Sequence, residues 1–190
     1  MLEVLVTILI LAFGMLGLAG LQSKIFSAEM ESYQRAQAVV LMNDMVERLN
    51  ANRDAAASYV PSVLGTTILG PASDGQPAPP NPCPTASATS ADIVARDQCE
   101  WSQALKGVAE TSGSQSVGGM IGAIGCIKQL QAQQTTPTCV PGIYLVSVAW
   151  QGLNATSIPS VGCGQGSFGG DDRFRRAIST RVAIGLPTCQ

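Results

Sequence analysis

The sequence contains no histidine, and only 13% of its residues are charged and 5% aromatic. Without histidine, the serine–histidine and cysteine–histidine nucleophile systems of many hydrolases are excluded. Basic residues are not in excess, since eleven Lys and Arg face thirteen Asp and Glu. The concentrated positive surface that nucleic-acid binding needs is therefore not expected. Neither standard glycine-rich phosphate loop occurs. We expect a protein that is not an enzyme, with no cofactor, no metal site, no nucleic-acid partner and no small-molecule substrate.

One long apolar run begins close to the first residue. The eighteen residues from Val4 to Leu21 contain no charge and no amide. That is about the length a helix needs to cross the hydrocarbon core of a bilayer. Glu3 lies just before the run, and an acid at the centre of such a span costs roughly 2.5–3.5 kcal/mol on insertion scales. A cost of this kind indicates a function for Glu3, and the alternative is a solvated acid at the level of the lipid headgroups.

The sequence beyond this run favours one continuous helix over a cleaved signal peptide. No basic residue precedes the run, and helix-compatible sequence continues without proline to about Arg53. Apolar residues then recur at spacings of mostly three or four, which predicts one face of a helix. They are Phe26, Met30, Tyr33, Ala36, Val40, Leu41, Met45 and Leu49. We expect an apolar transmembrane and assembly helix over residues 1–27 and a globular head over residues 28–190.

The head is expected to begin with a connector and a short helix. Prolines and glycines from Ala55 to Pro84 prevent a sustained helix or a central strand there. A helix is predicted from an N-cap at Ser90 to Lys106. Its buried face would contain Val94, Trp101 and Leu105, and Trp150 is likewise expected in the core rather than in a ligand platform. Residues 107–119 are predicted to form a loop.

Three strands are expected in the second half of the head. Residues 120–127 are apolar but interrupted by glycines, which is typical of a bulged or edge strand. Residues 143–150 are the best candidate for a central strand, and residues 174–184 alternate in polarity. Between the last two strands, a loop over residues 152–172 is where functional surface is expected. The acids and arginines at its end, Asp171, Asp172, Arg173, Arg175 and Arg176, are expected to form a solvated face.

Six cysteines, all beyond the long helix, predict disulfides. No two are spaced as a zinc half-site, and an even count in turn-rich sequence indicates an oxidising compartment. Six cysteines allow fifteen pairings. Sequential pairing closes short loops and predicts the bridges Cys83–Cys99, Cys126–Cys139 and Cys163–Cys189.

These residues carry a family resemblance. Leu2-Glu3-Val4-Leu5-Val6, followed by a long helix with Gly14, Gly17 and Gly20, closely resembles type IV pilins and the pseudopilins of type II secretion. Farther along, the sequence resembles the minor pilins of the PilV type. The stretches that carry this second likeness are residues 92–106, 125–127, 144–150 and the arginine-rich terminal strand.

The resemblance implies an α+β pilin fold: a long N-terminal α-helix packed against an antiparallel β-sheet, with disulfide-stapled loops. It also implies that Glu3 pairs with the N-terminal amine of a neighbouring subunit during assembly. Pilin precursors carry a short basic leader that is removed before a methylated Phe. The sequence starts two residues beyond the place of that Phe, so we expect leader and Phe to belong to a longer precursor.

The function that this resemblance favours is that of a minor pilin helping to initiate a type IV pilus near its tip. The implied partners are major and minor pilins and a tip adhesin. The implied location is the inner membrane, with a periplasmic head, and then the extracellular pilus. A type II secretion pseudopilin is the nearest alternative. A membrane-anchored periplasmic binding module is another, and it predicts that replacement of Glu3 is tolerated. Whether the fibre serves twitching, adhesion or DNA uptake stays open.

Overall fold

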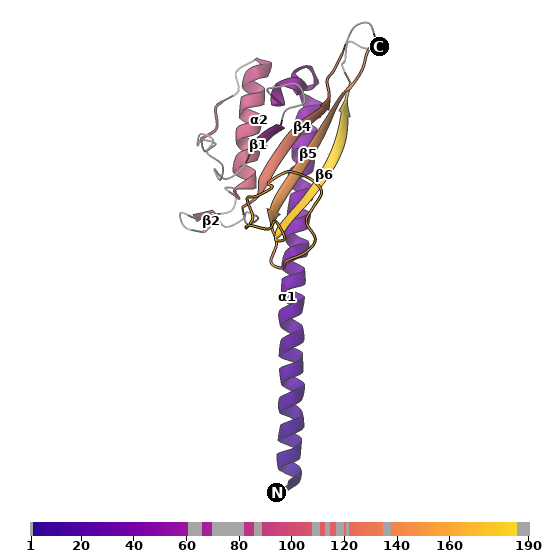
Figure 1. Ribbon diagram of the computed structural model, residues 1–190. Coiled ribbons are helices and arrows are strands. Elements are labelled where there is room, and N and C mark those ends of the chain that lie inside the picture. The colour runs from indigo at the N-terminus through magenta and orange to yellow at the C-terminus, as the bar shows by residue number, and fades with distance from the viewer. Residues whose placement is uncertain are drawn as a thin grey trace. The chain divides into compact units, whose positions relative to one another are not determined.

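The computed structural model describes residues 2–60, 66–69, 82–85, 89–107, 111–112, 115–116, 120, 122–134 and 138–185. The chain divides into two compact units, Met1–Ala36 and Gln37–Gln190. Helix α1 (Leu2–Ala51) contributes to both (Figure 1). The long helix expected from the sequence is therefore present and ends two residues before Arg53.

The predicted apolar stripe of this helix is only partly correct. In the second unit, Ala38, Met45 and Leu49 are completely buried, whereas Val40 is 67% exposed. The buried residues are separated by seven and four positions, which keeps them on one face of a helix. Val40 is two positions from Ala38, and two residues turn a helix by more than half a circle. In the first unit, the predicted stripe residues Phe26, Met30 and Tyr33 are exposed.

Two short helices follow α1. The 3₁₀ helix η1 (Arg53–Tyr59) lies directly after it, and α2 (Ser90–Leu105) follows later. The N-cap of α2 is Thr89, one residue earlier than predicted, because the Thr89 hydroxyl accepts a hydrogen bond from the main-chain N–H of Asp92 at 3.3 Å. The Asp92 carboxylate accepts a hydrogen bond from that hydroxyl in return, which satisfies the helix start. Val94, Trp101 and Leu105 are buried as predicted.

The sheet has four strands in the order β1-β4-β5-β6, all antiparallel. They are β1 (Thr66–Leu69), β4 (Ile124–Gln131), β5 (Gly142–Gln151) and β6 (Arg175–Ile184). The predictions for β5 and β6 are confirmed. The first predicted strand begins later than expected and is interior, not an edge, because β1 pairs with its outer side. It does contain a bulge, between Gln129 and Gln131.

A second ladder lies within residues 107–119, which were expected to be loop. Strands β2 (Thr111–Ser112) and β3 (Gln115–Ser116) pair antiparallel there. The connector after residue 55 behaves as predicted in its described parts, since it contains only η1 and the edge strand β1.

The two faces of the sheet have different roles. The inner face packs on the second unit's part of α1 and on α2. Its main core residues are Trp101, Leu105, Ile127, Tyr144, Val146, Val148, Trp150 and Ile184, together with Ala38, Met45 and Leu49 of α1. Both tryptophans are thus core residues, as expected. The outer face carries a smaller cluster of Ile124, Cys126, Ala149, Cys163 and Phe168. The segment after β5 folds back onto this outer face.

The disulfide pattern differs from sequential pairing. Cys83–Cys99 is present as predicted, but Cys126 bonds to Cys163. The predicted Cys126–Cys139 and Cys163–Cys189 bridges are therefore wrong. Cys139 is also disulfide-bonded, and Cys189 lies outside the described residues. The reason is topological: Cys126 is on the outer face of β4, and the returning loop places Cys163 over it, whereas Cys139 follows that strand in another connection.

Candidate functional site

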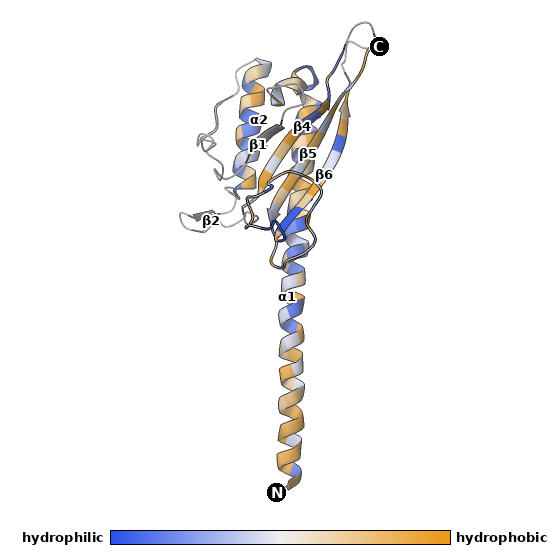
Figure 2. Cartoon of the chain, viewed as in Figure 1, coloured by the Kyte–Doolittle hydropathy of each residue, from blue (hydrophilic) through white to orange (hydrophobic). Residues whose placement is uncertain are grey.

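The N-terminal part of α1 is an apolar surface without a partner inside its unit. Its best 18-residue window has a mean hydropathy of 2.6, and none of that window is buried. The large side chains there are 48–81% exposed from Leu2 to Leu21. By length and composition the helix can cross a membrane. Figure 2 shows the apolar colour running along this part of α1. So large an exposed apolar surface requires lipid or other protein chains around it.

Glu3 is in the first turn of this helix and is its only acid before Glu29. The structure places Glu3 at the edge of the apolar surface, on an exposed position. A carboxylate near the positive N-terminal end of a helix is locally favourable. Its burial among apolar helices would need a compensating cation.

The loop between β5 and β6 is fastened to the outer face of the sheet. The Cys126–Cys163 disulfide attaches its middle to β4. Phe168 packs with Ile124 and Ala149 in the small outer cluster. The expected surface loop over residues 152–172 is therefore present, but it is covalently attached to the outer face of the sheet and packs against it.

Arg175 provides a second attachment for this loop. Its side chain is 1% exposed, and it donates hydrogen bonds to the carbonyl oxygens of Pro159 (3.1 Å), Cys163 (3.0 Å) and Val161. Its Nε lies 3.4 Å from Asp172 Oδ2, an ion pair without hydrogen-bond geometry. The guanidinium therefore ties three carbonyls of one loop to the start of β6.

Asp172 and Arg176 complete the attachment. Asp172 accepts a hydrogen bond from the N–H of Gly166 at 2.9 Å and has a φ of 54°, a conformation that aspartate tolerates better than most residues. Arg176 donates to Asn154 O and to Thr156 Oγ1, each at 2.7 Å. The expectation that this charged group forms only a solvated face is thus wrong for Asp172 and Arg175, which are buried, whereas Arg176 is half-buried and its hydrogen bonds are exposed. Arg173 and Asp171 are exposed, as expected.

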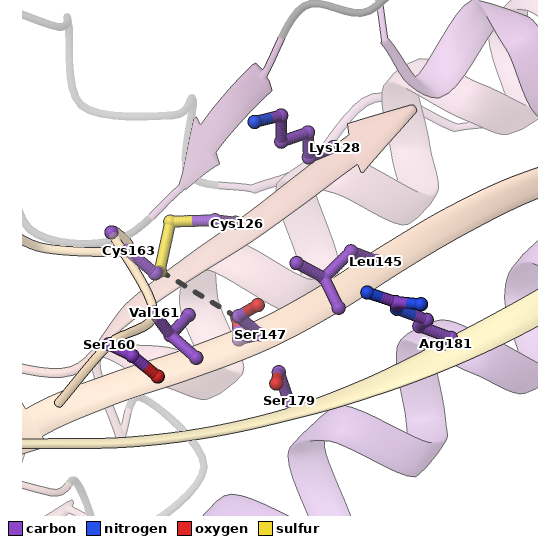
Figure 3. A pocket seen from close by; sticks show the side chains of 10 residues that line it. Cys126, Lys128, Leu145, Ser147, Ser160, Val161, Cys163, Ser179 and Arg181 are labelled. Carbon is purple, nitrogen blue, oxygen red and sulfur yellow. Dashed lines mark hydrogen bonds between the residues drawn. A yellow bond between two sulfur atoms is a disulfide. The ribbon is translucent and has the colours of Figure 1, made fainter. Parts of the chain in front are cut away.

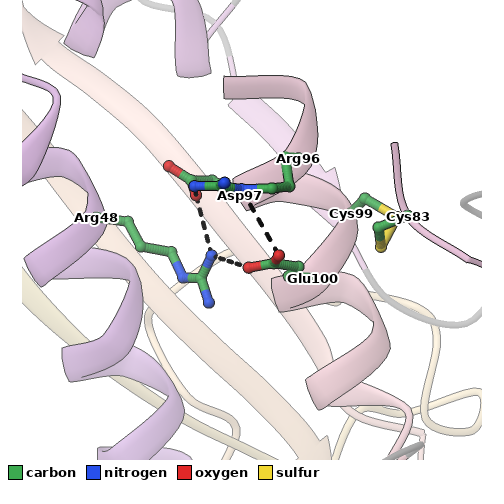
Figure 4. The surroundings of a disulfide bond; sticks show 6 residues. All are labelled: Arg48, Cys83, Arg96, Asp97, Cys99 and Glu100. Atoms are coloured by element: carbon green, nitrogen blue, oxygen red, sulfur yellow. Dashed lines mark hydrogen bonds and ion pairs between the residues drawn. A yellow bond between two sulfur atoms is a disulfide. The ribbon is translucent and has the colours of Figure 1, made fainter. Parts of the chain in front are cut away.

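A second charged group joins α1 to α2 within the head. Arg48 donates to Asp97 at 3.0 Å and to Glu100 at 2.7 Å (Figure 4). It also pairs with Asp44 at 3.1 Å. Burial by itself would lower the pKa of Arg48, but the hydrogen bond to Glu100 and the charge of Asp44 raise it above its ordinary value. The Cys83–Cys99 disulfide attaches the chain before α2 to the same helix, through Cys99.

Tyr59 contacts the same charged group. Its hydroxyl donates a hydrogen bond to Asp97, which is 5% exposed. Burial and this hydrogen bond raise the pKa of Tyr59 above its ordinary value. Asp97 thereby has three partners, which are the Tyr59 hydroxyl and the two cations Arg48 and, at 3.8 Å, Arg96, and this suits a buried carboxylate. Neither this group nor the loop attachment has the form of a catalytic or metal site. Within the described ranges, no cluster of three His, Cys, Asp or Glu could hold a metal ion.

The sequence was compared with models of known protein families, and one family matches. Residues 20–99 match the family model Tt1218-like, described as type IV pilin Tt1218. The matched stretch runs from the end of the apolar run to the middle of α2. This match supports the type IV pilin superfamily. No curated protein and no solved structure matches the sequence.

The pilin fold explains what the separate parts are for. The long helix, the antiparallel sheet and the disulfide-fastened loop are the α+β architecture expected of a pilin. Pilins are structural proteins, and this pilin has the exposed apolar helix that such a subunit needs. The sequence singled out Glu3, whose role stays a prediction, and it predicted disulfides, but it did not reveal the loop attachment by Arg175. The signal available for that attachment was an arginine at the start of an alternating strand, which by itself is ordinary.

Proposed function

We propose that this pilin is a minor subunit of a type IV pilus that helps to initiate assembly near the fibre tip. Before assembly, residues 2–21 hold it in the inner membrane with its head in the periplasm. In the fibre, the same residues pack against the helices of major and minor pilins, and the head contacts neighbouring heads and a tip adhesin. The PilV-type likeness of the head supports the minor role.

The observation that carries this proposal is the exposed apolar helix with one acid at its start. A simple anchor needs only apolar residues, and an acid makes insertion less favourable. An acid that meets a neighbour's N-terminal amine in the fibre instead gains a partner for its charge. Glu3 can then set the axial register between adjacent helices, because a misplaced helix leaves both charges buried and uncompensated.

The disulfides support the location of the head. Cys83–Cys99 and Cys126–Cys163 fasten α2 and the loop after β5, and structural bridges of this kind persist in oxidising compartments. A periplasmic and then extracellular head therefore fits its covalent chemistry. The head needs this reinforcement because it is rich in loops.

The test is the fate of the protein in a pilus-forming bacterium whose own copy has been deleted. The complete precursor is expressed from a plasmid, surface fibres are sheared off, and fibre and membrane fractions are compared by immunoblot. We expect a small amount in the fibres relative to the major pilin, and fewer fibres per cell without it. Immunogold labelling should mark fibre ends.

Other outcomes would support the alternatives. Retention of all the protein in membranes, with a normal number of fibres, would favour a membrane-anchored binding module. Incorporation only into fibres made by overproduced type II secretion genes would favour a pseudopilin. Labelling along the whole fibre would contradict the tip position but keep the pilin role.

A further inference from the structure

A groove lies on the outer face of the sheet, beside the fastened loop. Its volume is about 660 Å³, within the range of ligand pockets. Its floor comes from two cross-strand rows. One row is Lys128, Leu145 and Arg181, and the other is Cys126, Ser147 and Ser179. Residues 160–163 form the wall at one end (Figure 3).

The groove has positive charge without internal compensation. Lys128 and Arg181 are both exposed, and among the described residues neither has an ion pair or a side-chain hydrogen bond. No acidic residue is among the described side chains that line the groove. This local charge stands out in a chain whose net charge is −2. Leu145 separates the two cations and is half-buried, so the centre of the floor is apolar.

A disulfide and buried hydrogen bonds hold the wall of the groove in place. The Cys126–Cys163 disulfide fixes its base. Arg175, which is buried behind it, engages the carbonyl oxygens of Val161 and Cys163. Carbonyl oxygens that are hydrogen-bonded to a guanidinium are less repulsive to an approaching anion. The exposed hydroxyls of Ser160 and Ser179 supply additional donors around the floor, in which Ser147 is buried.

The lining residues limit the class of ligand. None of them is aromatic, so the stacking platform that nucleic-acid bases require is missing from this groove. Two cations on either side of an apolar residue instead suit a ligand with two separated carboxylates. Neighbouring strands are about 4.8 Å apart, so Lys128 and Arg181 begin roughly 10 Å apart. In an extended peptide, side chains four positions apart point to the same face and begin about 13 Å apart, a span that the flexible lysine and arginine side chains can match.

We propose that this groove binds an acidic peptide segment of another protein, with two carboxylates four residues apart held by Lys128 and Arg181. The middle residue of this stretch lies over Leu145, and the hydroxyls of Ser160 and Ser179 donate hydrogen bonds to the peptide. This inference requires neither the apolar helix nor Glu3. Fibre incorporation can therefore succeed where peptide binding fails, and the reverse, so the two proposals are tested separately.

The test uses the full chain in a non-ionic detergent and a fluorescent probe, the capped peptide Glu-Ser-Val-Ser-Glu. Binding is followed by fluorescence anisotropy at low salt, with Gln-Ser-Val-Ser-Gln as the uncharged control peptide. We expect the acidic peptide to bind at least fivefold more tightly than the control. Lys128→Gln and Arg181→Gln should each weaken binding about three- to fivefold, as for exposed ion pairs. The double variant should weaken it about tenfold.

Matched variants separate the groove from general charge. Arg53→Gln removes an exposed cation outside the groove and should leave the affinity unchanged. Lys128→Arg and Arg181→Lys keep the charge and should keep most of the binding. Equal affinity for the two peptides, or an unchanged affinity in the double variant, would overturn the proposal. Displacement of the probe by inorganic phosphate as effectively as by unlabelled peptide would also overturn it, in favour of a site for small oxyanions.

Discussion

The indole nitrogen of Trp101 donates a 2.7 Å hydrogen bond to the main-chain carbonyl of Leu41. This bond joins α2 to the second unit's part of α1, and the indole ring is completely buried beneath the sheet. The space for the ring comes from Gly125 of β4. A Cβ atom there would lie 2.3 and 2.5 Å from two ring carbons of Trp101 and 2.7 Å from Leu105.

Gly125→Ala should therefore destabilise the head. The added methyl group forces the indole or the strand to move, and overpacking of this kind costs about 1–3 kcal/mol. Urea unfolding of the protein in detergent, followed by tryptophan fluorescence, measures the loss. Gly170→Ala is the control, because nothing lies within 4 Å of its Cβ. A Gly125→Ala protein as stable as that control would contradict the described packing.

Arg175→Met should release the loop that is fastened to the outer face. The substitution removes the donors to three carbonyls and leaves Asp172 without its cation. We expect a loss of about 3 kcal/mol, as for a broken buried ion pair. Hydrogen exchange should become faster in residues 159–172 and stay unchanged in α2. Arg173→Met, at an exposed position, should have neither effect, and slow exchange in both variants would refute the role of Arg175.

The disulfide pattern can be read directly by mass spectrometry of the unreduced, digested protein. We expect peptides joined through Cys83–Cys99 and through Cys126–Cys163, and a third bridge that contains Cys139. Thiol labelling without reductant should modify no cysteine among these five. Detection of a Cys126–Cys139 peptide would contradict the position of the loop over β4.

Stability at alkaline pH should depend on Tyr59. The pKa of its hydroxyl is raised in the folded protein, first by burial and then by the hydrogen bond to Asp97. A raised pKa means that the folded state holds its proton longer than the unfolded state, whose tyrosine titrates near pH 10. The stabilisation is complete below about pH 10 and is lost as the pH rises further.

Thermal unfolding at pH 9 and pH 11 measures this effect. Tyr59→Phe should flatten the decrease, although it lowers stability at pH 9 because Asp97 loses a donor. Some decrease should remain, because burial also raises the pKa of Tyr144. An equally steep decrease in Tyr59→Phe would show that the alkaline sensitivity lies elsewhere.

Much of the fold was predictable because it depends on patterns among residues close together in the sequence. The apolar run, the period of three to four residues and the β-branched stretch before Trp150 predicted α1, α2 and β5 without knowledge of long-range contacts. The interior position of β4 was not predictable in the same way. Its glycines look like an interruption in the sequence, but Gly125 is required by Trp101, which is 24 residues earlier.

The candidate functional residues likewise include some that the sequence could indicate and some that it could not. Glu3 could be singled out because it is a single acid beside a long apolar run. The groove could not be predicted from the sequence, because Lys128 and Arg181 come to lie on either side of Leu145 only through the pairing of both strands with β5. The pairing of Cys126 with Cys163 likewise depends on a loop that returns over the sheet, whereas the guess of sequential bridges considered only separation along the chain.

The central claim is that Glu3 acts in assembly and not merely at the membrane surface. The test compares wild type, Glu3→Gln and Glu29→Gln, each expressed as the complete precursor in a pilus-forming bacterium without its own copy. Glu29→Gln removes an acid from the same helix beyond the apolar run and serves as the control. Immunoblots of sheared fibres and membranes give the incorporated fraction. We predict equal membrane levels for all three and at least a tenfold loss from fibres for Glu3→Gln alone. Equal amounts of wild type and Glu3→Gln in the fibres would contradict the account and leave the helix as a simple anchor.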